Sequence, residues 1–226
     1  MHLTQRKNWR PLNLINCIGK LGETVVIERI QDHGRSVLHP QQYGSVHKRS
    51  AVDVLYQSVM EARHCLDGGG SVGWAFWDIE EGLQNVQRER VLARLGECEP
   101  LRFWRTWLGQ FMTPREFEVL WDGTVRGNGR ADKGIQQGSP LSPILFLVHM
   151  APILEEMERR VKEEVGSLTV CFPLYVDDLY CGLYNRRHAG GKVDRHERMQ
   201  DMVVRVQRTV SEVAREYEGQ LAADKE

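Results

Sequence analysis

Pro173-Leu174-Tyr175-Val176-Asp177-Asp178-Leu179-Tyr180 is the stretch of sequence that decides the fold. Apolar and aromatic residues, which favour β-strands, flank two adjacent acids, so residues 169–184 are predicted to form a hairpin with Asp177 and Asp178 at its tip. Turns favour Asp because its side chain hydrogen-bonds the nearby backbone, which gives the pair a purely structural explanation. Two carboxylates this close also raise each other's pKa unless a cation is present, so a metal site is the second explanation.

A third acid ends another predicted strand. Residues 72–79 are a short, nearly continuous apolar run that reaches Asp78, as expected for a buried central strand with a carboxylate at its exit. Three carboxylates at strand ends can hold two Mg²⁺ ions, which prefer oxygen ligands and leave positions for phosphate oxygens. Such ions activate a hydroxyl and stabilise a leaving pyrophosphate, which is the chemistry of nucleotidyl transfer.

The rest of the chain alternates between predicted helices and strands. Helices are predicted over residues 12–30, 52–66, 88–95, 101–111, 144–165 (with a break near Pro152) and 199–217. The Asp122-Gly123 pair predicts a two-stranded ribbon. This order predicts an α+β fold in which helices pack on one face of an antiparallel sheet.

Two of these helices have an apolar stripe. Ser50 and Asp53 form a capping-box pattern that starts the second helix. In the first helix the apolar face holds Leu14, Ile18, Leu21 and Val25, and in the second the predicted core stripe holds Val52, Leu55, Val59, Ala62 and Leu66.

Composition sets the class of protein. A chain of 226 residues with 41% hydrophobic residues can bury the core of one substantial domain or two small ones. The 30 basic and 31 acidic residues nearly cancel, so nucleic-acid binding would depend on local basic strips. The five scattered cysteines suggest neither a disulfide framework nor a zinc site.

With no apolar leader and no long apolar run, we expect a soluble intracellular protein, nuclear or cytoplasmic, with no membrane contact.

These features together resemble the reverse transcriptase family, and the resemblance is closest to the enzymes of non-LTR (LINE-like) retrotransposons. Its most specific parts are Gly134-Ile135-Gln136-Gln137-Gly138-Ser139-Pro140-Leu141-Ser142-Pro143-Ile144-Leu145-Phe146 and the Tyr175–Asp178 turn. Less specific blocks are Trp9–Leu12, Asn16–Lys20 with Glu23, Gln42–Gly44 with Arg49 and Ser50, Asp78 and Ile79 with Asn85 and Val86, and Ala214, Glu216, Gly219 and Lys225.

The resemblance implies a right-hand polymerase arrangement. Residues 1–70 would be a fingers-like part, and residues 71–226 a palm whose antiparallel sheet packs on helices. The catalytic hairpin would span residues 173–184, with fingers insertions at about 87–133. No thumb is expected within the chain.

Roles for individual residues follow from the same resemblance. Asp78, Asp177 and Asp178 would be the catalytic metal ligands, with help from the Ile79 carbonyl, and would hold two Mg²⁺ ions or Mn²⁺ in their place. The implied partners are an RNA template, a DNA primer and deoxynucleoside triphosphates. The implied nucleotide-binding residues are Arg10, Leu83, Gln137 and Gly138. Arg10 would contact the triphosphate or be an ordinary surface arginine, and Lys225 would protonate pyrophosphate or be a surface lysine.

The chain departs from the family pattern beside the nucleotide. Gly82, Leu83 and Gln84 stand where the family usually has Ala-Phe-Asp. Leu83 therefore replaces the aromatic ring that screens out ribose 2′-hydroxyls, and weaker discrimination against ribonucleotides is expected. Gln136 likewise replaces a proline, which relaxes the turn before Gln137.

Two other functions stay open. An RNA-directed RNA polymerase shares the acid arrangement, although residues 137–143 and Val176 favour reverse transcription. A decayed or repurposed inactive fragment is favoured by the altered residues 82–84 and by the missing thumb, whereas the intact acids argue against complete decay.

Overall fold

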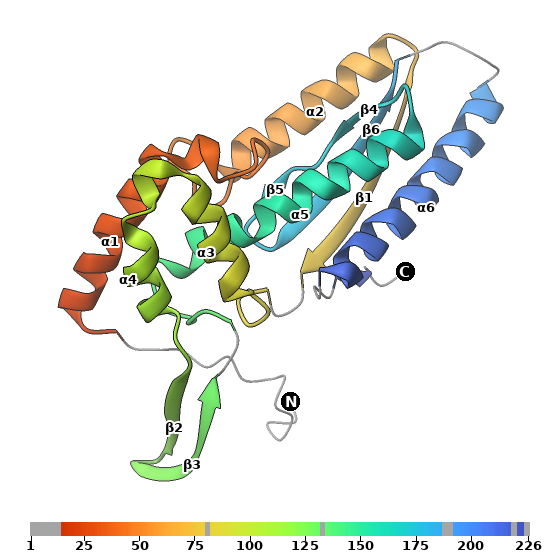
Figure 1. Ribbon diagram of the computed structural model, residues 1–226. Coiled ribbons are helices and arrows are strands. Elements are labelled where there is room, and N and C mark those ends of the chain that lie inside the picture. The colour runs from red at the N-terminus through yellow and green to blue at the C-terminus, as the bar shows by residue number, and fades with distance from the viewer. Residues whose placement is uncertain (1–14, 80–81, 132–133, 187–191, 218–220, 224–226) are drawn as a thin grey trace.

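The computed structural model describes residues 15–79, 82–131, 134–186, 192–217 and 221–223 (Figure 1). The described chain has the mixed helix and antiparallel-sheet architecture that the sequence predicts, with a five-stranded sheet and a separate two-stranded ribbon. Within the described ranges, no helix combines the length and the apolar character that crossing a membrane requires.

Strand β1 (Ser71–Ile79) lies inside the larger sheet. The strand order is β4 (Thr169–Cys171), β6 (Asp178–Asn185), β1 and β7 (Leu221–Ala223), and β5 (Leu174–Tyr175) also pairs with β6. The predicted central strand is confirmed, but only one of its faces is fully buried. Ala75, Trp77 and Ile79 enter the core, whereas Trp74 and Phe76 on the other face are 39% and 50% exposed.

Helices α5 (Ser142–Val165) and α6 (Lys192–Glu216) pack against each other and cover the buried face of the sheet (Figure 1). The predicted break near Pro152 is wrong, because α5 continues through this residue. Pro152 removes one backbone hydrogen bond. The helix is buried both before and after it, so packing keeps the two halves aligned.

Helix α2 (Ala51–Asp67) lies against the other face of the sheet, so the prediction that helices pack on one face only is wrong. The helix begins with the predicted Ser50–Asp53 capping box. Its predicted core stripe is wrong. Four of the five predicted residues are exposed, namely Val52, Leu55, Val59 and Leu66, and the buried residues are Val54, Ser58, Ala62 and Cys65. Ala62 and Cys65 contact Tyr184 of β6. The buried face of α2 therefore includes small side chains and not the larger apolar stripe.

Helix α1 (Cys17–Asp32) begins after Asn16, whose side chain accepts a hydrogen bond from the Gly19 backbone N–H at 2.6 Å. The first residues of the predicted helix, including Leu14, lie outside the described part of the chain. Its apolar stripe does not form the core contact, because Ile18 is 85% exposed and Leu21 and Val25 are also exposed. The opposite face is buried and consists of Glu23, Val26 and Ile30.

The short 3-10 helix η2 (Gly34–Ser36) follows α1. The elements between β1 and α5 in the chain are α3 (Arg88–Glu97), the 3-10 helix η3 (Glu99–Leu101), α4 (Trp104–Phe111), β2 (Arg115–Trp121) and β3 (Thr124–Ala131). The predicted β2–β3 ribbon is confirmed and projects away from the helices (Figure 1). Asp122 and Gly123 form its turn with φ angles of 49° and 70°. Positive φ angles at both positions give a two-residue turn whose twist matches the right-handed twist of the strands.

Candidate active site

Asp78 and Asp178 lie directly opposite each other in the β1–β6 ladder. Side chains of directly opposed residues point to the same face of a sheet, with Cβ atoms about 5 Å apart. Both residues are exposed, on the face that also carries Trp74 and Phe76. The strand pairing therefore brings two of the three predicted acids together.

The third acid lies in the turn that joins β5 to β6. Tyr175 pairs with Asp178, so Val176 and Asp177 form a two-residue loop. The predicted hairpin is confirmed, but its predicted tip is wrong by one residue, because Asp178 is the first residue of β6. The Ile79 backbone N–H donates to the Asp177 carbonyl at 3.1 Å, which attaches the turn to the end of β1. Val176 has φ +57°, an unusual value for a β-branched residue that costs about 1–3 kcal/mol. The surrounding contacts must hold this turn in place.

The donor chemistry of the acid pair fits a divalent cation. Carboxylate oxygens are the ligands that Mg²⁺ prefers, and Asp78 and Asp178 present theirs on one face. Among the described residues, however, no three Asp, Glu, His or Cys side chains are arranged as a group that could hold a metal ion. The structure thus places Asp78 and Asp178 opposite each other, and Asp177 does not join them in a group of three ligands.

A segment far from the hairpin in sequence runs beside β5. Leu174 exchanges backbone hydrogen bonds with it, because the Tyr43 N–H donates to the Leu174 carbonyl at 2.9 Å and the Leu174 N–H donates to the Gln41 carbonyl at 2.9 Å. Gln42 is fully buried, and its side chain donates to the Leu147 carbonyl of α5 at 2.8 Å. Residues 41–44 therefore connect the hairpin to α5.

The two predicted nucleotide-binding loops are in contact. The Ile135 backbone N–H donates to the Leu83 carbonyl at 2.8 Å, and Arg88 Nε donates to the Gly134 carbonyl at 3.2 Å. Leu83 is half-buried and packs against the core, and Gln137 is also half-buried. Gly138 is exposed and has φ +98°, a conformation that favours glycine.

The family described as "Reverse transcriptase (RNA-dependent DNA polymerase)" matches residues 4–225. The chain belongs to this family. Two curated relatives agree with the match. The "Transposon TX1 uncharacterized 149 kDa protein" of Xenopus laevis is 23% identical over 179 residues, and the "RNA-directed DNA polymerase from mobile element jockey" of Drosophila funebris is 23% identical over 146 residues. The predicted kinship with reverse transcriptases of LINE-like retrotransposons is confirmed.

These relatives are much longer than the chain. The matches cover 76% and 64% of the chain but only 14% and 16% of the two relatives. A telomerase from Candida albicans, solved in complex with the TWJ fragment of telomeric RNA, aligns with 92% of this chain and 34% of its own, at 11% identity and a TM-score of 0.48.

One acid of this reverse transcriptase domain is buried. It lies in a block that resembles the family, but the resemblance implied no role for it. Glu23 of α1 is only 3% exposed. Ser139 Oγ donates to Glu23 Oε2 at 2.6 Å, and the Leu141 backbone N–H donates to the same oxygen at 3.3 Å. Glu23 therefore joins α1 to the loop that holds Gly138. Its spacing from Val26 and Ile30 placed it on the buried face, which is the only local signal for it.

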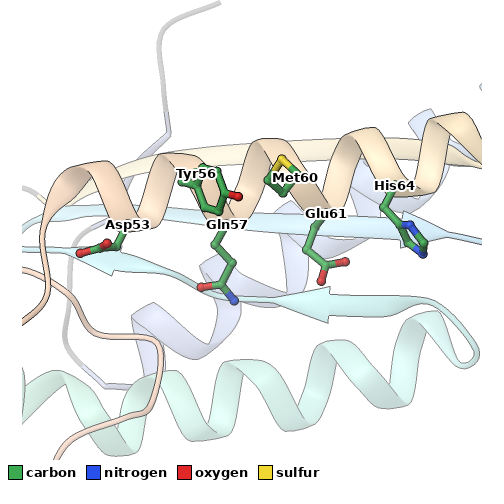
Figure 2. Close-up of a pocket in the computed structure, with 6 residues that line it drawn as sticks. All are labelled: Asp53, Tyr56, Gln57, Met60, Glu61 and His64. Carbon is green, nitrogen blue, oxygen red and sulfur yellow. The ribbon is translucent and has the colours of Figure 1, made fainter.

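Two predicted site residues, Arg10 and Lys225, lie outside the described residues. A hollow of about 550 Å³ lies along α2 (Figure 2). Its lining contains none of the predicted site residues, and Figure 2 shows its members side by side along the helix: Asp53, Tyr56, Gln57, Met60, Glu61 and His64. The hollow therefore shares no lining residue with the acid pair.

Proposed function

We propose that this domain is the catalytic core of an RNA-directed DNA polymerase, which adds deoxynucleotides to a primer 3′-hydroxyl on an RNA template as part of a retrotransposon. The observation that carries the proposal is the register of Asp78 against Asp178 at the exit of the central strand. In a family of reverse transcriptases, an acid pair at that position has an immediate chemical use. The family match alone would not identify the reacting centre.

In the proposed polymerase, the larger sheet with α5 and α6 is the palm. Residues up to about 70, together with residues 87–133, form the fingers, and the β5–β6 hairpin carries the catalytic turn. The contact between the Leu83 and Gly134 regions then lies where fingers and palm meet at the nucleotide.

Asp78, Asp177 and Asp178 would hold two Mg²⁺ or Mn²⁺ ions, with the Ile79 carbonyl as a further oxygen ligand. Bound there, the ions would lower the pKa of the primer 3′-hydroxyl and neutralise the leaving pyrophosphate.

The chain's other residues would bind and orient the nucleotide. Gly138 offers bare backbone beside the sugar, and Gln137 borders it. Arg10 would bind the triphosphate, because a guanidinium can contact two phosphate oxygens at once, and Lys225 would give a proton to pyrophosphate.

The part of this sheet face that α2 leaves exposed beside the acids suits the primer–template. Trp74, Phe76 and Tyr180 form an aromatic row there, with ring centroids 6.2 Å apart for the first pair and 5.7 Å for the second. Trp74 is 39% exposed, although it lies in the apolar run 72–79 for which a buried strand is predicted. Aromatic surfaces next to a polymerase centre can stack on bases or pack against sugars.

A second candidate is an inactive or repurposed reverse transcriptase fold. Two observations favour it: the described residues do not gather three acids into a metal-holding group, and Gly82, Leu83 and Gln84 replace the family's usual residues. In this alternative the acid pair would be a remnant, and the protein would bind nucleic acid or protein without turnover.

Primer extension separates the candidates. The purified chain is given an RNA template with an annealed primer and Mg²⁺, and extension with deoxynucleotides is compared with extension by ribonucleotides, for the parent and for Asp177→Asn. We expect the parent to extend the primer with deoxynucleotides, and we expect Asp177→Asn to abolish this extension. Preferential ribonucleotide extension would indicate an RNA-directed RNA polymerase. Absence of any metal-dependent extension would leave the inactive fold.

A further inference from the structure

We propose that Gly44 is a positioning residue for the catalytic turn: because it has no side chain, residues 41–44 can pack against Val176 and hold Asp177 and Asp178 in place. The inference rests on the proposed nucleotidyl transfer and adds to it a residue remote in sequence from the acids.

The approach of Gly44 to the turn leaves no room for a side chain. A Cβ atom built on Gly44 would lie 2.5 Å from Val176 Cγ2, 2.6 Å from the Val176 backbone nitrogen and 3.3 Å from its Cα. The first two distances are below 3.0 Å, an approach that real Cβ atoms essentially never show. Because two of these three contacts are to backbone atoms, rotation of the Val176 side chain cannot relieve them. Any larger residue at position 44 must displace the turn or its own segment.

The segment that carries Gly44 is fixed on both sides. Its neighbours Gln41 and Tyr43 are hydrogen-bonded to the backbone of Leu174, two residues before Val176. The Gln41 side chain also accepts a hydrogen bond from the Phe172 N–H. Buried Gln42 is tied to α5, and breaking its bond to the Leu147 carbonyl would leave a buried polar group without a partner. Displacement therefore falls on the strained turn.

A shift of Val176 reaches the acids directly. Asp177 is the next residue, and its carbonyl is bonded to the Ile79 N–H at the end of β1. Asp178 follows and is the residue paired with Asp78. Since Val176 already has a positive φ, the turn has little conformational freedom to absorb a change without altering this register.

The test compares Gly44→Ala with Gly22→Ala. Gly22 lies exposed in α1, and a Cβ added there would meet nothing within 4 Å, so it is a matched control. Three measurements are made on each: thermal unfolding, Mn²⁺ binding by electron paramagnetic resonance without nucleotide, and single-nucleotide incorporation on an RNA template. The Mn²⁺ titration reports on the acids whether or not the protein turns over.

We expect Gly44→Ala to fold, to bind Mn²⁺ several-fold more weakly and to lose roughly ten- to a hundredfold in kcat, with KM for the nucleotide little changed. Gly22→Ala should match the parent in Mn²⁺ binding and nucleotide incorporation, and should unfold at the same or a slightly higher temperature because alanine favours a helix interior more than glycine does. Adding Val176→Gly to Gly44→Ala removes the contact with Cγ2 and the cost of the positive φ, so the turn backbone can move away from the new Cβ atom, and part of the Mn²⁺ affinity should be recovered.

A folded Gly44→Ala protein with parental Mn²⁺ affinity and kcat would overturn the inference. If Gly44→Ala does not fold, recovery of folding and Mn²⁺ binding in the double variant supports the inference, and continued failure overturns it. A parent that binds Mn²⁺ without incorporating nucleotide would defeat the proposed function alone, because the affinities of the variants would still decide the role of Gly44.

Discussion

Asp78 of β1 faces Asp178 of β6 across two paired strands, so two acids oppose each other within the larger sheet. Like charges in such a pair destabilise a sheet by roughly 0.2–1 kcal/mol. The fold therefore gains nothing from this pair, and a bound cation would convert the repulsion into attraction.

Removing the repulsion should stabilise the metal-free protein. We expect Asp78→Asn to raise the free energy of unfolding by about 0.5 kcal/mol without metal, and to lose most of the stabilisation that Mg²⁺ gives the parent. Thermal unfolding with and without Mg²⁺ measures both effects. Asp122→Asn, in the exposed β2–β3 turn, is the control and should retain the parent's Mg²⁺ response. Equal Mg²⁺ stabilisation of parent and Asp78→Asn would exclude Asp78 as a ligand.

The buried Glu23–Ser139 bond should couple α1 to the nucleotide loop. A double-mutant cycle of Glu23→Gln and Ser139→Ala, followed by urea unfolding, should give a coupling energy of about 1–2 kcal/mol, because the bond involves a charged acceptor. The control cycle replaces Glu23→Gln by Glu28→Gln, an exposed acid on the same helix, and should give no coupling. A Glu23–Ser139 coupling indistinguishable from that control would show that the contact contributes nothing.

Folding stability should fall in mildly acidic solution because of His149. This residue of α5 is 5% exposed, and its Nδ1 has no hydrogen-bond partner among the described residues. Burial, with a smaller contribution from the charge of Arg90, lowers its pKa from 6.5 to about 4. The unfolded chain therefore binds the proton first, so His149's contribution to stability is complete above pH 6.5 and is lost as the pH falls towards about 4.

The loss attributable to His149 should reach at most about 3 kcal/mol. Urea unfolding at a series of pH values for the parent and His149→Leu measures it, and the variant should show a flatter dependence between pH 6.5 and about 4. His64→Leu, which changes an exposed histidine of α2, should keep the parental slope. A parental slope in His149→Leu would refute this origin of acid sensitivity.

Leu83 should set the discrimination between deoxyribonucleotides and ribonucleotides. An aromatic ring blocks a 2′-hydroxyl more rigidly than a branched aliphatic chain, so we expect Leu83→Phe to raise the preference for deoxynucleotides about tenfold. The measurement is the ratio of kcat/KM for the two nucleotides. Leu92→Phe, another half-buried leucine packed on the core, controls for general effects of size. Equal ratios for Leu83→Phe and parent would reject the role.

Features with local signals could be predicted from the sequence. The β5–β6 hairpin, the Asp122-Gly123 ribbon and the Ser50–Asp53 cap each depend on residues within a few positions of one another, and the structure confirms all three. Asp78 could be placed at a strand end for the same reason. Its pairing with Asp178 follows once both strands share a sheet.

What the sequence could not predict depends on distant partners. Apolar spacing identified a stripe on α2 but not which face meets the sheet, because that face is set by the contacts of Ala62 and Cys65 with Tyr184, which is far away in the sequence. The partner of Glu23 is 116 residues away and that of Gln42 is 105 residues away, so no local pattern points to either bond.

The most direct test of the central claim is incorporation of one complementary deoxynucleotide on an RNA template under single-turnover conditions, for the parent, Asp178→Asn and Asp122→Asn. We predict Mg²⁺-dependent incorporation by the parent and by Asp122→Asn, and a loss of about a thousandfold or more in Asp178→Asn. A folded parent that binds the primer–template but incorporates no nucleotide at any Mg²⁺ or Mn²⁺ concentration would contradict the account, as would an Asp178→Asn protein with parental rates.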